Sequence, residues 1–237
     1  MSERAVRRFY KDVQFGERDG GFVLLLDGKP AKTPHRAPLV LPTRRLAETI
    51  ADEWRGQGER IDPRTMKLTG LAHSAIDRAG RERGKVIDHA MSFGRSDLLC
   101  YRAEAPEALA RRQSETWDPL LEWAHDGRGL RLTADAGIVY IEQPADALLR
   151  MQELTAGFDD FTLAAFEAAA TVTGSFVLAL ALVEEHESAD AVFEAAQLEE
   201  LYQVEVWGRE AEAEARRQRM REELRAIERF LGLLKSG

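Results

Sequence analysis

The sequence is poor in cysteine and has no apolar run behind its N-terminal charges. Cys100 is the one cysteine among 237 residues, which excludes an intramolecular disulfide and favours a reducing compartment. The N-terminal segment carries charges without an apolar stretch after them, which is not the pattern of a secretory signal. We therefore expect a cytoplasmic location.

An excess of positive charge is also missing. The chain carries 33 Lys and Arg against 41 Asp and Glu, a net charge of −8. Nonspecific binding of nucleic acid depends on clustered Lys and Arg, so no nucleic-acid partner is expected. The uncharged stretch 168–183 is shorter than the roughly 20 residues that a bilayer requires. We interpret it as a buried central helix and expect no membrane insertion.

The motifs of common catalytic and cofactor sites are missing as well. No glycine cluster has the spacing of a phosphate-binding loop, and no two of the 5 histidines have the spacing of metal ligands. Cys100 lies among apolar neighbours, which is typical of an inert buried thiol. The residues therefore predict no catalytic group, no cofactor and no metal ion, and they favour a binding protein over an enzyme.

One pair of residues keeps an enzyme open as the alternative function. Asp97 and Arg102 stand at the two ends of a short apolar run. As an active site they would combine an acid with an anion-binding arginine in a cleft of a small enzyme. As structural residues, Asp97 would cap or pair and Arg102 would hold it in place, and this interpretation is favoured.

The first part of the chain has the pattern of β structure. Residues 21–26 are an apolar run, and Asp27-Gly28 after them is a hairpin turn signal. A second short strand is expected at 39–41. Thr43 is suited to cap a helix that ends at Gly56. The apolar face of that helix consists of Leu46, Ala47, Ile50 and Trp54.

The remainder is predicted to be mostly helical. Residues 61–69 are expected to be a connector before a helical pattern that starts at Leu71, and 130–133 with 138–141 are expected to form a small hairpin. Further helices are predicted at 107–125, 144–157, 161–185 and 189 to about 234, the last one broken or bent near Gly208. The predicted fold class is α+β, with a small β-rich N-terminal domain over residues 1–65 and a larger, mostly α-helical domain over residues 66–237.

The least ordinary part of the last helix is the stretch 198–210. It places Glu205, Trp207 and Gly208 inside an otherwise charged helix. A glycine in a helix interior costs about 1 kcal/mol, so something besides solubility is required of this segment. Tyr202 lies one turn before Glu205 on the same face.

Several motifs follow one another over most of the chain. They are Arg8-Phe9-Tyr10-Lys11, residues 26–34, Glu53-Trp54, Gln57, Ile61-Asp62-Pro63, residues 97–102, Gln113 with residues 117–121, Gly174-Ser175, and Tyr202-Gln203 with Glu205 and Trp207-Gly208. In this order, from Phe9 to about Leu234, the chain resembles the ATP synthase assembly chaperones that bind the α subunit of the F(1) sector. Two positions depart from the family pattern: Lys67 replaces a usual proline, and Arg209-Glu210 replaces an acidic run.

The resemblance implies a two-domain chaperone without enzymatic activity or nucleotide, here a bacterial member. Its partner would be the newly made α subunit, held until the β subunit replaces it. The family's functional glutamate corresponds to Glu205, and we expect Tyr202, Trp207 and Glu210 to contact the partner with it. Two other interpretations stay open: in one, Trp207 is a core residue, and in the other, Glu205 simply pairs with Arg209. The lack of a coiled-coil pattern over most of the chain favours a monomer, and a scaffold with a generic helical surface is a further rival.

Overall fold

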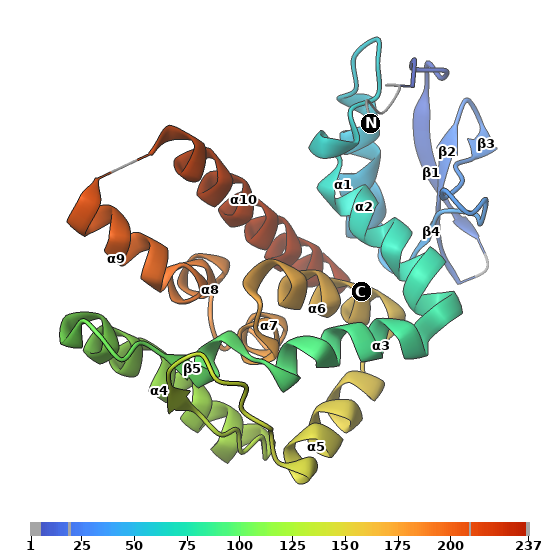
Figure 1. Cartoon of the computed structure of the whole chain (residues 1–237). Helices are drawn as coiled ribbons and strands as arrows, with labels where there is room; N and C mark the ends of the chain where they lie inside the picture. The colour runs from blue at the N-terminus through green and yellow to red at the C-terminus, as the bar shows by residue number, and fades with distance from the viewer. Residues whose placement is uncertain (1–5, 19, 209, 236–237) are drawn as a thin grey trace. The chain divides into compact units, whose positions relative to one another are not determined.

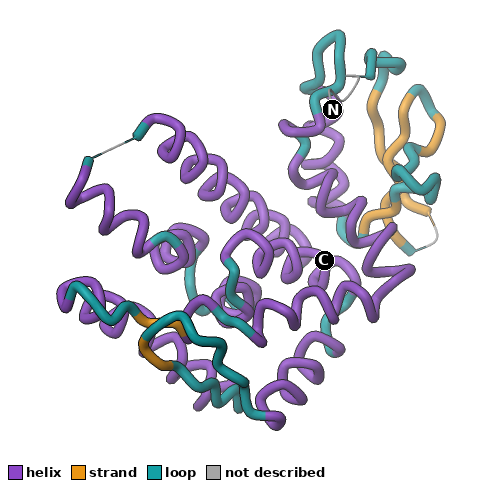
Figure 2. Tube along the Cα trace, viewed as in Figure 1, coloured by secondary structure: helices purple, strands orange, loops and turns teal. Residues whose placement is uncertain are grey.

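The computed structural model describes residues 6–18, 20–208 and 210–235 (Figure 1). The chain divides into two compact units. The sheet unit comprises Met1–Arg83, Asp160–Ala165 and Arg229–Gly237, and the helical unit comprises Gly84–Asp159 and Phe166–Glu228. The α+β fold class is confirmed, with a small N-terminal sheet and a larger helical part (Figure 2). The domain boundary after residue 65 stays a prediction.

The sheet is built around one central strand. β2 (Gly21–Leu26) pairs antiparallel with β1 (Val13–Arg18), β3 (Lys29–Pro30) and β4 (Val40–Leu41). Asp27 and Gly28 have positive φ angles of 48° and 75°, as a two-residue hairpin turn requires. The strand at 21–26 and its turn are therefore confirmed.

α1 (Arg44–Arg55) forms as its sequence predicts. The Thr43 hydroxyl accepts a hydrogen bond from the N–H of Leu46 at 3.2 Å, which satisfies one of the free donors of the first turn. The predicted apolar face is buried in full. The Tyr10 hydroxyl donates to the carbonyl of Trp54 at 2.8 Å and fixes the last turn, after which Gly56 caps the helix.

The expected connector 61–69 is too long. It contains a 3₁₀ turn (Pro63–Thr65), and α2 (Lys67–Ser74) already begins at Lys67. The Glu53 carboxylate on α1 accepts hydrogen bonds from the N–H groups of Leu68 (2.9 Å) and Thr69 (2.8 Å). This cap comes from a distant residue, and it stabilises the start of a helix that no neighbouring residue predicts. A π-helical turn (Ala75–Ala79) leads from α2 to α3 (Gly80–Arg95).

Most remaining segments are helices. They are α4 (Glu107–Arg128), α5 (Ala145–Ala156), α6 (Asp160–Thr173), α7 (Phe176–Val183), α8 (Ala189–Ala196), α9 (Leu198–Trp207) and α10 (Ala211–Leu234). The helix predicted at 161–185 is wrong in its continuity, because Gly174 has a φ of 72° and Ser175 caps α7 by accepting from the N–H of Leu178 at 3.0 Å. The break near Gly208, which has a φ of 92°, is confirmed. The helix predicted from 189 is wrong in its first part, because a second break at Gln197 separates α8 from α9.

α7 is the centre of the helical unit. All of its side chains are buried, which explains the uncharged stretch in the sequence. Among the residues that the structure describes, no helix combines the length and the apolar character that crossing a membrane requires. The Trp117 side chain on α4 is completely buried, and its Nε1–H donates to the carbonyl of Ala195 on α8 at 2.9 Å.

The predicted hairpin at 130–133 and 138–141 is wrong. β6 (Asp135–Ala136) pairs in parallel with the distant β5 (Tyr101–Arg102), beside α4 in Figure 1. The alternating apolar residues have the local pattern of strands. The backbone of Thr133, however, bonds to the buried Gln143 side chain and not to a second strand: the Gln143 amide accepts from the Thr133 N–H at 2.8 Å and donates to its carbonyl at 3.0 Å.

Candidate functional site

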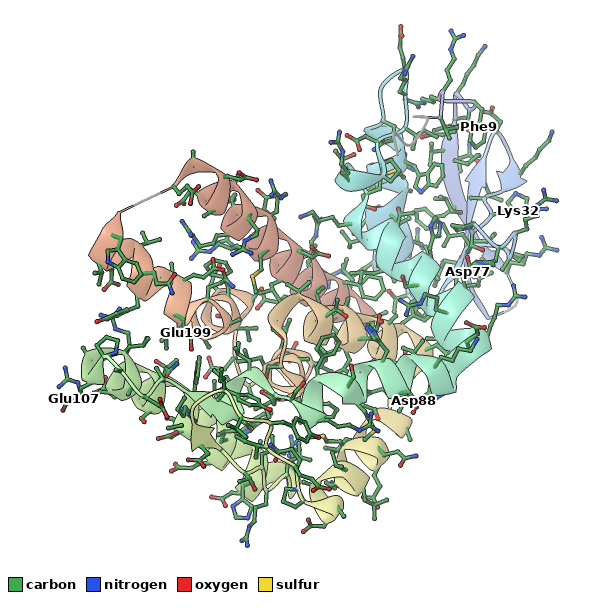
Figure 3. The ribbon with its side chains drawn as sticks, in the orientation of Figure 1. Phe9, Lys32, Asp77, Asp88, Glu107 and Glu199 are labelled. Atoms are coloured by element: carbon green, nitrogen blue, oxygen red, sulfur yellow. The ribbon has the colours of Figure 1, made fainter. Side chains whose placement is uncertain are left out.

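α9 carries three of the four predicted partner-binding residues, on two different faces. Tyr202 and Glu205 lie on the face toward α4, as does Glu199, which Figure 3 labels. Trp207 lies on the face toward α10, about half a turn away around the helix. The sequence suggests a single contact patch, whereas the structure presents two adjacent surfaces that share the C-terminal end of α9.

On the α4 side, an arginine holds the predicted glutamate. Nη1 of Arg112 lies 2.9 Å from both carboxylate oxygens of Glu205. The guanidinium carbon of Arg112 also lies 5.3 Å from the ring centroid of Tyr202, within cation–π range. The side chains of Arg112 and Glu205 are 42% and 58% exposed, so this ion pair orients the carboxylate more than it stabilises the fold.

Sequence reasoning misses the partner of Glu205. The expected pair with Arg209 falls on a residue outside the described ones, and the observed partner, Arg112, lies on another helix. Its one sequence signal is its place next to Gln113, which is part of the family motif. Gln113 is buried: it accepts from the N–H of Ala103 at 2.8 Å and donates to Glu199 at 2.6 Å, which joins α4 to α9.

Trp207 is not a core residue. It is 78% exposed as the last residue of α9, and its neighbour Val206 is 54% exposed. Gly208, with its positive φ, then ends the helix in a conformation that side chains disfavour. Large exposed aromatic residues are uncommon on monomer surfaces and are enriched where partners bind.

A groove of about 390 Å³ runs between α9 and α10. Trp207 and Glu210 line it, together with Val204, Arg216 and Arg217. Glu200 forms ion pairs across it with Arg216 and, at 3.9 Å, with Arg217. Glu210, the fourth predicted contact residue, therefore lies with Trp207 and apart from Tyr202 and Glu205. An apolar edge with paired charges beside it suits a protein segment better than a small molecule.

Asp97 has a structural position. It is fully buried and accepts hydrogen bonds from the N–H groups of Leu99 and Val177, each at 3.0 Å, so that it caps α7 from outside that helix. Burial raises the pKa of the Asp97 carboxyl to about 6, although the hydrogen bonds from Ser175 and from backbone amides oppose the shift.

Arg102 contacts a different set of residues. It pairs with Asp118 at 2.7 Å and lies over the ring of Trp117, 5.1 Å from the centroid. Burial raises the pKa of the neighbouring Cys100 thiol to about 12, which leaves it unreactive. Among the described residues, no group of three His, Cys, Asp or Glu side chains is placed to hold a metal ion. The geometry thus gives Asp97 and Arg102 packing roles.

Comparisons with known proteins agree on one family. The family model described as ATP12 chaperone protein matches residues 7–125. The crystal structure of Atp12 from Paracoccus denitrificans is similar with a TM-score of 0.90 and 38% identity, over 97% of this chain and 99% of that one. An aspartate-to-lysine mutant of P. denitrificans Atp12p gives the same TM-score and identity and is covered to 98%. The mitochondrial protein atp12 of Schizosaccharomyces pombe is 26% identical over 220 residues, 88% of this chain and 76% of that protein.

Proposed function

Because the chain belongs to the ATP12 chaperone family, we propose that it is a non-enzymatic, ATP-independent chaperone for assembly of the F(1) sector of ATP synthase, and that its client is the unassembled α subunit. An α subunit without its neighbours exposes surface that the finished assembly buries, and such surface promotes aggregation. The chaperone covers this surface until the β subunit replaces it. The cytoplasmic location and the monomeric state stay predictions.

The observation that carries this proposal is the end of α9. Trp207 is a large aromatic side chain with 78% of its surface in water, beside a groove that Val204 and Ala213 also line. Tryptophan is enriched at binding hot spots because one residue buries a large area with little loss of conformational freedom. A client segment that enters the groove would cover Trp207 and Val204 together.

Glu205 supplies the polar half of the contact. Its carboxylate is half exposed and already oriented by Arg112, so an arginine or a backbone N–H of the client meets it in a defined position. Tyr202, which packs against the same guanidinium, limits the movement of Arg112. The charge and the orientation together give this side of α9 specificity for a cationic client surface.

Release needs no nucleotide in this mechanism. The contact combines one exposed aromatic, one exposed ion pair and a groove, which is a small interface that a partner with a larger contact area can displace. The β subunit, which binds the same client surface over a larger area, then displaces the chaperone by competition. Glu210 lies in the groove and adds negative charge where the client chain leaves it.

Co-expression with the α subunit of the same organism tests the proposal. Size-exclusion chromatography compares the wild type, Glu205→Lys and the charge-matched control Glu122→Lys, which changes an exposed residue on α4. We expect soluble α subunit to co-elute with the wild type and with the control but not with Glu205→Lys. All three should show the same circular dichroism melt. An α subunit that does not co-elute with the wild type contradicts the proposal.

A further inference from the structure

One apolar segment of the helical unit lies outside the α9 site and is open to water. It is the tip of the loop between β6 and α5, where Ile138, Val139 and Tyr140 are 96%, 80% and 64% exposed. No charged residue lies within 136–141. Single exposed apolar residues are ordinary on protein surfaces, but three in succession are unfavourable unless a partner covers them.

The base of this loop is held firmly. The buried amide of Gln143 makes two hydrogen bonds to the backbone of Thr133, 2.8 and 3.0 Å long, and thereby closes the loop. On the other side, the N–H of Gly137 donates to the carbonyl of Arg102 at 2.9 Å, with a φ of 100° that favours glycine. The loop is therefore a positioned protrusion whose tip is apolar.

The surroundings of the tip are acidic. Residues 132–149 contain Asp135, Glu142 and Asp146 but no Lys or Arg, and both Asp135 and Glu142 are exposed. The arginines that flank this stretch, at 131 and 150, donate hydrogen bonds to the last turn of α4 instead. Glu104 approaches from the β5 side, with its carboxylate 3.4 Å from where a Cβ on Gly137 would lie. These four carboxylates form an acidic collar around the tip. A partner that binds the tip comes close to them, which favours a surface with Lys or Arg at its rim.

The loop is connected to the α9 site through one buried residue. The segment that pairs with the loop base contains Arg102, and the N–H of the next residue, Ala103, donates to the side chain of Gln113. The same side chain donates to Glu199 on α9. Both surfaces thus belong to one hydrogen-bonded part of the helical unit and can contact the same partner.

We propose that Ile138, Val139 and Tyr140 form a second client contact, in which the loop tip enters an apolar pocket with a basic rim on the unassembled α subunit. This inference rests on the proposed function. A second copy of this chain is a poorer occupant, because pairing two tips brings their identical acidic collars together at a cost in repulsion. The α9 site and the loop would hold the client at two separate points.

Site-directed cross-linking tests the position of the contact. Since Cys100 is buried, a cysteine introduced on the surface is the one reactive thiol of the described chain. Val139→Cys carries a benzophenone maleimide, and Leu149→Cys on α5, where the side chain is 58% exposed, serves as the matched control. Each labelled protein is irradiated with purified α subunit diluted from denaturant. We expect adducts with the α subunit on the order of tenfold more abundant at position 139.

Equal yields at the two positions, or adducts mainly between two copies of this chain, overturn the inference. A binding measurement distinguishes this from failure of the proposed function. The triple variant Ile138→Ser, Val139→Ser, Tyr140→Ser should bind the α subunit on the order of tenfold to a hundredfold more weakly, with Val139→Ser alone as a milder second variant. Unchanged binding by both variants, while Glu205→Lys abolishes binding, refutes the loop contact alone. An α subunit that does not bind the wild type refutes both proposals.

Discussion

The two units of the chain differ in charge much more than the whole sequence suggests. The sheet unit has 19 Lys and Arg against 13 Asp and Glu, a net charge of +6, and the helical unit has 14 against 28, a net charge of −14. The net charge of −8 is the sum of these two opposite values. A positively charged partner would therefore be attracted by the helical unit, which also carries both exposed apolar surfaces described above.

The units also differ in how they use a buried carboxylate. Asp97 in the helical unit caps α7, and burial dominates its environment and raises its pKa. Asp77 in the sheet unit, labelled in Figure 3, is also largely withdrawn from water, and burial alone would raise its pKa. There the hydrogen bonds from the Thr33 hydroxyl and the His35 N–H outweigh burial, and the pKa of Asp77 is lowered. The two buried aspartates therefore contribute to stability with opposite dependence on pH.

The largest expected effect is on the core of the helical unit. Trp117→Ala removes a completely buried side chain and leaves the carbonyl of Ala195 without its donor. We expect a loss of about 3–5 kcal/mol in the free energy of unfolding. Urea unfolding followed by circular dichroism measures it. Retention of sheet-unit amide protection during hydrogen exchange of this variant would show that the two units unfold separately, and simultaneous loss would show that they unfold together.

The next effect is the pH dependence caused by Asp97. Its folded pKa of about 6 exceeds the unfolded value of 3.8, so the folded state binds the extra proton between these values. Asp97 therefore contributes about 3 kcal/mol to the free energy of unfolding below pH 4, and this contribution is lost as the pH rises through 6. Asp97→Asn should flatten this part of the stability profile, as measured by urea midpoints from pH 4 to 7. A wild-type profile that is flat in this window contradicts the assignment.

Asp77 should produce a smaller effect of opposite sign. Its folded pKa lies below the unfolded value of 3.8, so its stabilisation is present above that value and is lost as the pH falls through the folded pKa. Asp77→Asn should cost about 1–2 kcal/mol at pH 7, because it weakens the hydrogen bonds from Thr33 and His35. The free energies of unfolding of the variant and the wild type should converge at low pH. A constant difference at every pH would mean that packing, and not charge, is responsible.

The smallest effect is expected at the exposed pair of Arg112 and Glu205. A double-mutant cycle with Arg112→Ala and Glu205→Ala should give a coupling of about 0.2–1 kcal/mol in the free energy of unfolding. Client binding should respond far more strongly than stability to Glu205→Ala, which separates a contact residue from a structural one. A coupling of several kcal/mol would assign the pair to the fold instead.

Features that depend on neighbouring residues could be predicted from the sequence. The hairpin turn at Asp27-Gly28 and the cap of α1 by Thr43 form from residues within one turn of each other. The break at Gly208 has the same origin, since the glycine itself adopts the positive φ. The α+β class follows from the sum of these local signals.

Features that depend on distant residues could not be predicted. The start of α2 is set by Glu53, which lies 15 residues before Leu68. The strand partner of β6 is β5, and the ion-pair partner of Glu205 is Arg112, 93 residues away. No periodicity in one segment contains this information. The sequence leaves the exposure of Trp207 undecided for the same reason, because burial depends on which helices pack against α9.

The ion pair between Arg112 and Glu205 sets a condition on every client that uses this glutamate. A client cation that approaches from the α4 side would not meet a bare carboxylate; it would substitute for an arginine that is already there. The substitution breaks one charged hydrogen bond for each one that it makes, so its net gain is small, and the displaced guanidinium remains tethered nearby as a standing competitor. When the client dissociates, Arg112 binds the Glu205 carboxylate again at once, because it does not have to diffuse from solution. A chaperone that must release its client benefits from carrying, within its own chain, the cation that takes the client's place.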